Sequence, residues 1–191
     1  AYRDLDVLQN HLHLPVQSGN DSVLNTMRRD HTIAEYLELL TELKSEVPDI
    51  ALSTDIIVGF PGETDAAFED TLTIMEKVGY SSSYMFAYSP RPGTPANDLP
   101  DSVPEEVKKQ RLQKTIAMQS QISQQQGQVY IGEKVAVLIE GRSSKPGYAF
   151  KGRNPQYWNV NIQGSDLKTG DTVTVEIEQV SGHSLNGKAL L

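Results

Sequence analysis

One acidic residue in an apolar setting is the first candidate for chemistry. Asp55 lies in the β-branched, mostly apolar run of residues 51–60. A carboxylate there is costly to bury unless it is hydrogen-bonded or belongs to a site. Upstream, Gln17 and Ser18 offer an amide and a hydroxyl at the end of a short run that alternates polar and apolar residues. These side chains either bind a ligand or make ordinary turn and helix-capping contacts.

Two arginines and a glycine-containing turn extend this group. Arg28 and Arg29 stand in an acidic stretch and could hold a carboxylate in bidentate geometry, or could form a solvated helix face. The turn GFPGE, residues 59–63, would let a planar or phosphate-bearing group lie against its glycines. It lacks the spacing of the dinucleotide-binding and P-loop motifs, which disfavours those two readings.

Metal and nucleophile chemistry have little support. His11 and His13 share one face of a predicted strand, but without a third ligand we prefer packing or hydrogen bonding for them. No G-x-S-x-G nucleophile elbow is present. The sequence contains no cysteine, so this chain supplies no disulfide, cysteine nucleophile or thiolate ligand for a metal or iron–sulfur cluster.

A second group of candidates lies in Gly141–Ser165, a stretch without acidic residues. Cations can follow a phosphate backbone while aromatic faces stack unpaired bases, although some of the rings must fill a core instead. We predict RNA contact here, with these candidates: Arg142, Lys145, Lys151, Arg153, Tyr157 and Trp158.

Alternating strand and helix patterns must position the first group. Strands are predicted at residues 11–17, 51–60 and 82–88, with a helical pattern over residues 21–47 that breaks near Arg29. Such alternation indicates a parallel sheet whose functional residues gather at the carboxyl ends of its strands.

The helices carry their own signals. Thr32 and Glu35 match a capping box and predict a helix start. A long later helix is expected to end before a Gln-rich linker at residues 123–128, near a domain boundary at Gly127. Its predicted buried face consists of Val107, Leu112, Ile116, Gln119 and Ile122.

The C-terminal part has a different pattern and a different charge. About five short strands with period-two alternation predict a small, OB-like barrel. Residues 1–127 carry 10 Lys and Arg against 19 Asp and Glu, whereas residues 128–191 carry 7 against 6. The net charge of −8 therefore comes from the first part of the chain.

Three motifs, HLHLPVQSGNDSVLNTMRR, LSTDIIVGFPGET and YSPRPGTPA, together resemble the radical S-adenosylmethionine (SAM) methylthiotransferases. The basic C-terminal part resembles their TRAM domain. The resemblance implies a half TIM-type α/β barrel with parallel strands, followed by a small all-β, OB-like TRAM barrel. Residues 1–127 would be the C-terminal portion of the radical SAM domain, and residues 128–191 the TRAM RNA-binding domain.

The resemblance also implies cofactors and an activity. The cofactors would be S-adenosylmethionine and two [4Fe-4S] clusters in the parent protein, with the cluster ligands absent from this chain. The parent would add a methylthio group to C2 of isopentenyladenosine beside the tRNA anticodon, and this fragment alone would be inactive. No catalytic residue or metal ligand is assigned here, and the implied cofactor-binding residues are Gln17, Ser18, Arg29, Asp55, Ile57, Val58 and Gly59.

The expected partner is a tRNA anticodon stem-loop, in the cytoplasm and without a membrane. An exposed sheet edge at residues 11–17 would favour self-association. Two alternatives remain open. One is a ribosomal-protein aspartate methylthiotransferase of the same family, whose terminal barrel should be acidic to face a basic protein. The other is a non-catalytic RNA-binding module.

Overall fold

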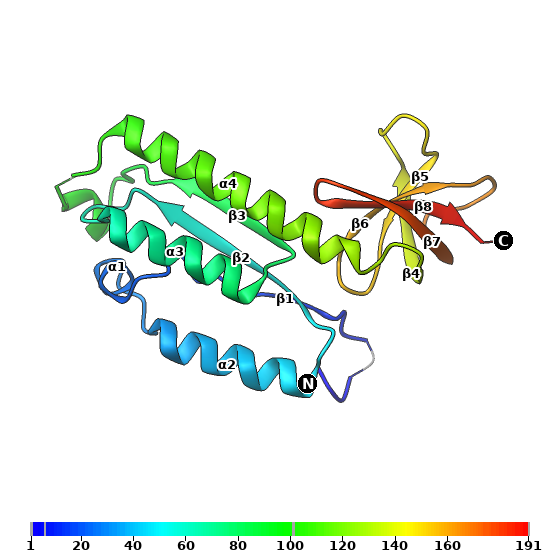
Figure 1. The fold of residues 1–191 in the computed structure, drawn as a ribbon, viewed down its shortest axis with the longest axis horizontal. Coiled ribbons are helices and arrows are strands. Elements are labelled where there is room, and N and C mark those ends of the chain that lie inside the picture. Colours follow the sequence, from blue (N-terminus) through cyan, green and yellow to red (C-terminus); the bar gives the residue numbers. More distant parts are fainter. Residues whose placement is uncertain (1, 6, 101, 191) are drawn as a thin grey trace. The chain divides into compact units, whose positions relative to one another are not determined.

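The computed structural model of the chain describes residues 2–5, 7–100 and 102–190, and it divides into two compact units. The strand–helix unit consists of His13–Glu46 and Leu52–Gln119. The barrel unit combines the chain from Ser120 onward with Val47–Ala51 and the N-terminal segment up to Leu12. Figure 1 identifies the elements of both units.

A three-stranded sheet supports the strand–helix unit, in the order β1 (His11–His13), β2 (Ala51–Val58) and β3 (Ser82–Ala87). β2 and β3 are parallel, with Asp55 opposite Tyr84, which confirms the predicted parallel sheet.

The first predicted strand, residues 11–17, is shorter than expected. Regular pairing ends at His13, and only an isolated bridge from Gln17 to Ile56 follows. Pro15 has no N–H to donate, and the N–H of Val16 donates to the Thr54 hydroxyl at 2.8 Å. The intervening residues therefore contact β2 without extending the strand.

The predicted helix break near Arg29 is confirmed. α1 (Asp21–Thr26) and α2 (Ile33–Glu46) are separate helices. α2 begins at the predicted capping box, in which the Thr32 N–H donates to Glu35 Oε2 at 2.8 Å and the Glu35 N–H donates to Thr32 Oγ1 at 3.2 Å. These bonds satisfy two N–H groups that a helix start leaves without partners.

Two further helices complete the unit's framework. α3 (Asp65–Val78) ends at Gly79, which takes the left-handed conformation expected of a helix cap. α4 (Glu105–Gln128) continues through residues 123–128, so the expected Gln-rich linker is helical. A short 3₁₀ helix, η1 (Pro95–Asp98), lies in the proline-rich segment before α4.

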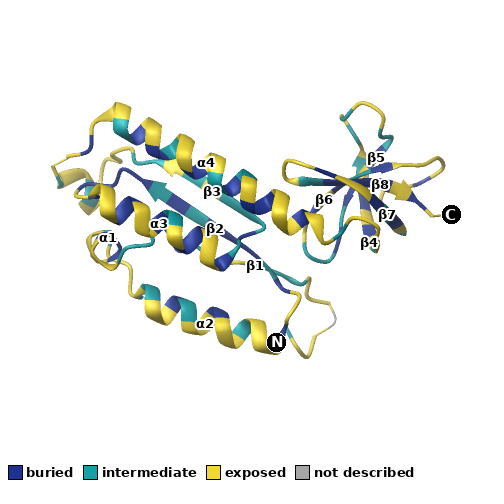
Figure 2. Cartoon of the chain, viewed as in Figure 1, coloured by how far each residue is buried: buried dark blue, intermediate teal, exposed yellow. Residues whose placement is uncertain are grey.

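The buried face of α4 also differs from the prediction. Ile116, expected inside, is 46% exposed. Gln119 and Ile122 are buried as predicted, but further polar side chains are buried as well, and Figure 2 shows dark blue residues spaced along this helix. The buried polar residues of α4 within the strand–helix unit are Lys108, Arg111, Thr115 and Gln119.

The C-terminal strands form the predicted closed five-stranded barrel, in the order β4-β5-β6-β8-β7. β6 and β8 are parallel and the other neighbours antiparallel. The strands are β4 (Lys134–Arg142), β5 (Phe150–Arg153), β6 (Asn159–Gln163), β7 (Thr172–Ser181) and β8 (Ser184–Ala189).

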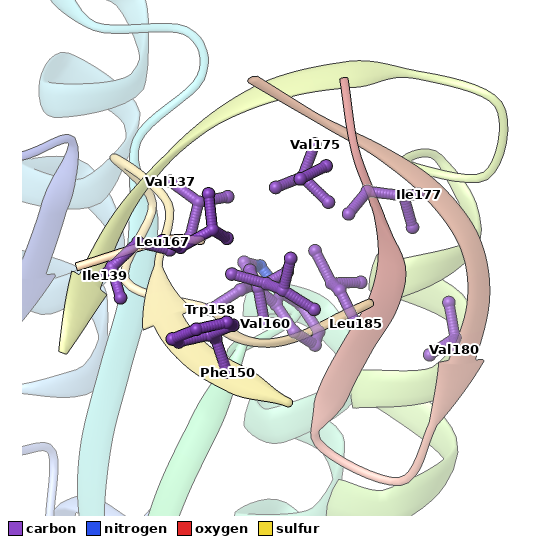
Figure 3. Packing of buried hydrophobic residues seen from close by; sticks show 12 residues of the cluster. Val137, Ile139, Phe150, Trp158, Val160, Leu167, Val175, Ile177, Val180 and Leu185 are labelled. Atoms are coloured by element: carbon purple, nitrogen blue, oxygen red, sulfur yellow. The ribbon is translucent and has the colours of Figure 1, made fainter. Parts of the chain in front are cut away.

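Apolar side chains fill the barrel. Figure 3 shows Val160, Val175, Ile177 and Leu185 pointing inward around the ring of Trp158. Alternate residues of each strand face this core, as expected for half-buried strands. Among the described residues, no helix combines the length and apolarity needed to cross a membrane.

Candidate functional site

A cavity of about 730 Å³ opens at the carboxyl ends of β2 and β3. Its volume is in the usual range for small-molecule sites, and this end of parallel strands is where such sites normally form. Four predicted cofactor-binding residues meet here, namely Gln17, Arg29, Asp55 and Ile57. The other lining residues are Thr26, Met27, Arg28, Phe60, Phe86, Ala87, Tyr88, Ser89, Arg91, Thr94, Pro95 and Ala96.

Three predicted cofactor-binding residues do not line this cavity. Ser18 is fully buried, with its hydroxyl 3.4 Å from that of Thr71. Val58 is also fully buried. The Gly59 N–H donates to Glu63 Oε2 at 2.7 Å. These three residues therefore lie outside the cavity lining.

Backbone pairing holds Gln17 at the cavity. Its N–H donates to the Asp55 carbonyl and its carbonyl accepts from the Ile57 N–H, each at 2.9 Å. Its φ of 70° is in the left-handed region, which is unfavourable for a residue with a Cβ and which recurs at ligand sites. Both bonds to β2 keep Gln17 in this conformation, beside Asp55.

The end of α1 places the two arginines. The Arg29 N–H donates to the Leu24 carbonyl and the Arg28 N–H to the Asn25 carbonyl, each at 2.9 Å. This is a Schellman motif, with Arg28 at φ 58° in the position that usually holds glycine. The sharp turn brings both guanidinium-bearing residues to the cavity, where they can pair with an anion.

Asp55 contributes a partly exposed carboxylate. Its Oδ1 lies 3.5 Å from His13 Nε2, and its side chain is 30% exposed. His13 Nδ1 is 2.9 Å from the Ser53 hydroxyl, so the hydrogen-bonding interpretation of this histidine is correct. Among the described residues, no group of three or more His, Cys, Asp or Glu is arranged to hold a metal ion.

Sequence reasoning missed the aromatic wall of the cavity. The rings of Phe60 and Tyr88 meet edge to face, with centroids 5.0 Å apart. The Tyr88 hydroxyl donates to the Ala96 carbonyl at 2.9 Å, which ties the proline-rich segment to the end of β3. The signal was available in the motifs GFPGE and YSPRPGTPA, each of which has an aromatic residue beside its turn residues.

A buried ion pair holds the turn after β2 against α4. Arg111 Nη1 donates to Glu63 Oε2 at 2.7 Å and to the Glu63 carbonyl at 3.1 Å. Both side chains are almost completely buried. Burial raises the pKa of Glu63, and this effect exceeds the opposing effects of the Gly59 N–H and Arg111. The ion pair with Arg111 therefore lowers the free-energy cost of keeping the buried Glu63 carboxyl ionised.

The barrel unit carries the predicted RNA-binding residues, and one of them needs correction. Trp158 is only 5% exposed and belongs to the barrel core, so its ring is not available to stack on a base. Tyr157 is 48% exposed. Its ring stacks on His11, with centroids 4.9 Å apart, and the Arg153 guanidinium lies 3.9 Å from its centroid.

The other cations differ in what they contact. Lys145 donates to Asn186 Oδ1 at 2.8 Å, which ties its loop to β8. Arg142 is exposed, with its guanidinium 4.4 Å from the centroid of the Phe150 ring. Lys151 is exposed on β5.

Comparison with known families gives two matches. Residues 1–75 match the radical SAM superfamily, and residues 128–190 match the TRAM domain.

Curated relatives match nearly the whole chain and share one name, tRNA-2-methylthio-N(6)-dimethylallyladenosine synthase. The relative from Yersinia pestis is 47% identical over 190 residues, covering 98% of this chain and 40% of its own length. The relative from Acetivibrio thermocellus is 44% identical over 187 residues, covering 98% and 39%. The relative from Agrobacterium fabrum is 44% identical over 185 residues, covering 97% and 40%. The chain thus spans about two fifths of the length of these relatives.

The solved structures that match include the coproporphyrinogen III oxidase HemN from Escherichia coli, described as a radical SAM enzyme. It matches with a TM-score of 0.49 and 16% identity, covering 88% of this chain and 41% of that one.

Proposed function

We propose that the chain belongs to the radical S-adenosylmethionine methylthiotransferase family and is part of a tRNA-modifying enzyme, on the basis of its two domain matches and its curated relatives. The whole protein would add a methylthio group to C2 of an isopentenyladenosine beside the anticodon. The chain would contribute part of the cofactor site and an RNA-binding barrel.

The cavity at the ends of β2 and β3 is the observation that carries this proposal, because its lining fits S-adenosylmethionine. Ile57 and Phe60 provide apolar surface for an adenine ring. Asp55 can accept hydrogen bonds from ribose hydroxyls, and Arg29 can pair with the methionine carboxylate. When bound, S-adenosylmethionine supplies the radical and methyl chemistry of the family.

The iron–sulfur clusters of the family do not fit the residues of this chain. The sequence contains no cysteine, and cysteine thiolates are the usual cluster ligands. The activity therefore requires residues from elsewhere in the protein. This chain's own contribution is to bind and orient the cofactor and the RNA.

The same proposal gives the architecture of the parent. Residues 1–127 would form the C-terminal half of a TIM-type barrel, and residues 128–191 an OB-like TRAM domain. β1 is an edge of the three-stranded sheet, and an unpaired edge favours pairing with another strand. We therefore propose self-association through β1 in the isolated chain, and a cytoplasmic location for the parent.

The outer surface of β4, β5 and β6 is the proposed RNA surface. Arg142, Lys151 and Arg153 belong to these strands, and Tyr157 in the β5–β6 loop offers a partly exposed ring. Exposed Arg142 and Lys151, together with the partly exposed Arg153 beside the Tyr157 ring, suit a single-stranded loop of RNA.

Fluorescence anisotropy tests the RNA proposal. The chain is titrated against a prenylated anticodon stem-loop, a scrambled hairpin and a basic ribosomal-protein peptide, at two salt concentrations. We expect tighter binding to the stem-loop that weakens with salt, since phosphate contacts release counterions. Preference for the peptide would instead favour a ribosomal-protein substrate, and equal binding to both RNAs would contradict anticodon recognition.

A further inference from the structure

A polar cluster crosses the open face of the sheet directly beside the cavity. His13 from β1 lies between two residues of β2, with Nδ1 2.9 Å from Ser53 Oγ and Nε2 3.5 Å from Asp55 Oδ1. Tyr84 of β3 stands opposite Asp55 in the strand register and packs edge-on against the His13 ring, with centroids 5.9 Å apart. Three adjacent strands thus each contribute a side chain to one cluster.

The anchoring of His13 comes from a buried hydroxyl. Ser53 is 2% exposed, and its hydroxyl pairs with Nδ1 of the imidazole. When the hydroxyl donates to Nδ1, the ring proton is carried by Nε2, which faces the Asp55 carboxylate. Because the Asp55 carboxylate can only accept, this is the tautomer of the neutral ring that pairs with both neighbours.

The contact with His13 distinguishes the two oxygens of the Asp55 carboxylate. His13 approaches Oδ1, and Asp55 also lines the cavity. An aspartate on a strand has a broad χ2 preference, so an oriented neighbour is needed to fix the carboxylate plane. With Oδ1 directed at His13, Oδ2 is the oxygen left for a ligand in the cavity.

We propose that His13 is a positioning residue of the cofactor site. Held by Ser53, it orients Asp55 so that the carboxylate accepts hydrogen bonds from the vicinal hydroxyls of a nucleoside ribose. His13 itself lies outside the cavity lining, so it acts through Asp55. This inference rests on the proposed cofactor site and adds to it a determinant of selectivity for ribose over deoxyribose.

The test compares two ligands that differ only in the hydroxyls. Binding of 5′-methylthioadenosine and of its 2′,3′-dideoxy analogue to the chain is measured by isothermal titration calorimetry. A hydrogen bond to a charged group predicts that the wild type prefers the diol by about 10- to 100-fold. The affinity for the dideoxy analogue reports binding without the two hydroxyls and serves as the internal reference.

Four histidine variants separate positioning from general packing. His13→Ala removes both contacts, His13→Asn keeps an acceptor near Ser53 only, and His13→Gln keeps a donor that can reach Asp55. We expect His13→Ala and His13→Asn to lose most of the diol preference and His13→Gln to retain much of it. The control is His183→Ala, which removes an imidazole from the barrel unit and should leave the preference unchanged. Circular dichroism verifies that each variant is folded.

The outcomes separate this inference from the proposed function. A His13→Ala variant with the wild-type diol preference overturns the role of His13, and the site itself stands if Asp55→Asn abolishes that preference. If Asp55→Asn leaves the preference unchanged, or if the wild type binds neither nucleoside, both the positioning role and the proposed cofactor site are wrong.

Discussion

Replacing Arg111 with alanine should strongly destabilise the strand–helix unit. The substitution removes two hydrogen bonds to Glu63, at 2.7 and 3.1 Å, and leaves a carboxylate that is 4% exposed without its cation. Loss of one partner from a buried ion pair costs about 3–5 kcal/mol. The bond from Arg111 to Asp65 adds little, because the Asp65 side chain is 95% exposed.

The single tryptophan makes the assay specific to each unit. Trp158 is the only tryptophan of the chain and lies in the barrel core, so its fluorescence follows barrel unfolding. Far-ultraviolet circular dichroism follows the helices, most of which belong to the strand–helix unit. In urea, Arg111→Ala should lower the circular dichroism midpoint by about 2 M, given typical slopes, and leave the fluorescence midpoint in place.

A lower pH should reduce the loss of stability that Arg111→Ala causes. Burial already raises the pKa of Glu63. Without Arg111 the carboxyl binds a proton more readily, and the neutral form needs no cation. The difference in stability between Arg111→Ala and wild type should therefore shrink as the pH falls from neutral toward the acid range. The control is Lys109→Ala on the exposed side of α4, which should change stability by less than about 0.5 kcal/mol. A loss for Arg111→Ala of that same size, or an equal shift in both signals, would refute the reasoning.

Three further predictions concern other features. Burial raises the pKa of Tyr36 and of Tyr80, so the unfolded chain loses these two protons at lower pH than the folded chain does. The free energy of unfolding should therefore fall above about pH 10. A flat profile there would contradict the burial of these phenols. Gly59→Ala, at φ 72° and against the side chain of the buried Lys108, should lower the free energy of unfolding by about 2 kcal/mol or more in the same urea titration. Gly62→Ala, at φ 83° with open space around it, should lower it by about 1 kcal/mol. Equal losses would contradict the close approach of Lys108 to Gly59. Lys151→Ala should reduce the slope of log affinity for the stem-loop against log salt by about one, and an unchanged slope would remove this residue from the RNA surface.

Local signals in the sequence predicted the elements well. The Thr32 and Glu35 capping box marks the start of α2 to the residue. Period-two alternation predicted a five-stranded barrel, and the structure contains one. Such features depend on neighbours along the chain, so the sequence pattern contains most of the information that determines them.

Features that depend on distant partners were not predicted. The apolar spacing on α4 favoured Ile116 as a core residue, but the charged Arg111, which was not expected inside, is buried because its partner comes from another element. Arg111 pairs with Glu63, and Gln119 donates to the Tyr80 carbonyl at 2.8 Å. A polar side chain inside a protein is satisfied by such bonds, and no periodicity of the helix itself reveals them.

The same limit explains the candidate sites. Asp55, which lines the cavity, was singled out because a carboxylate in an apolar strand is unusual by itself. Trp158 was misassigned because composition does not say on which side of a strand end a ring will lie, and the ring fills the barrel. The proposed role of His13 rests on the register of three strands, which no single motif contains.

The central claim is that this chain carries separate sites for a nucleoside cofactor and for RNA. It is tested most directly by amide NMR of the isotope-labelled chain, titrated first with S-adenosylmethionine and then with the prenylated stem-loop. The account predicts that the cofactor shifts the resonances of Gln17, Asp55 and Ile57, and that the RNA shifts those of Lys151 and Tyr157. Cofactor shifts confined to the barrel strands, or no shifts at the cavity at saturating cofactor, would contradict it.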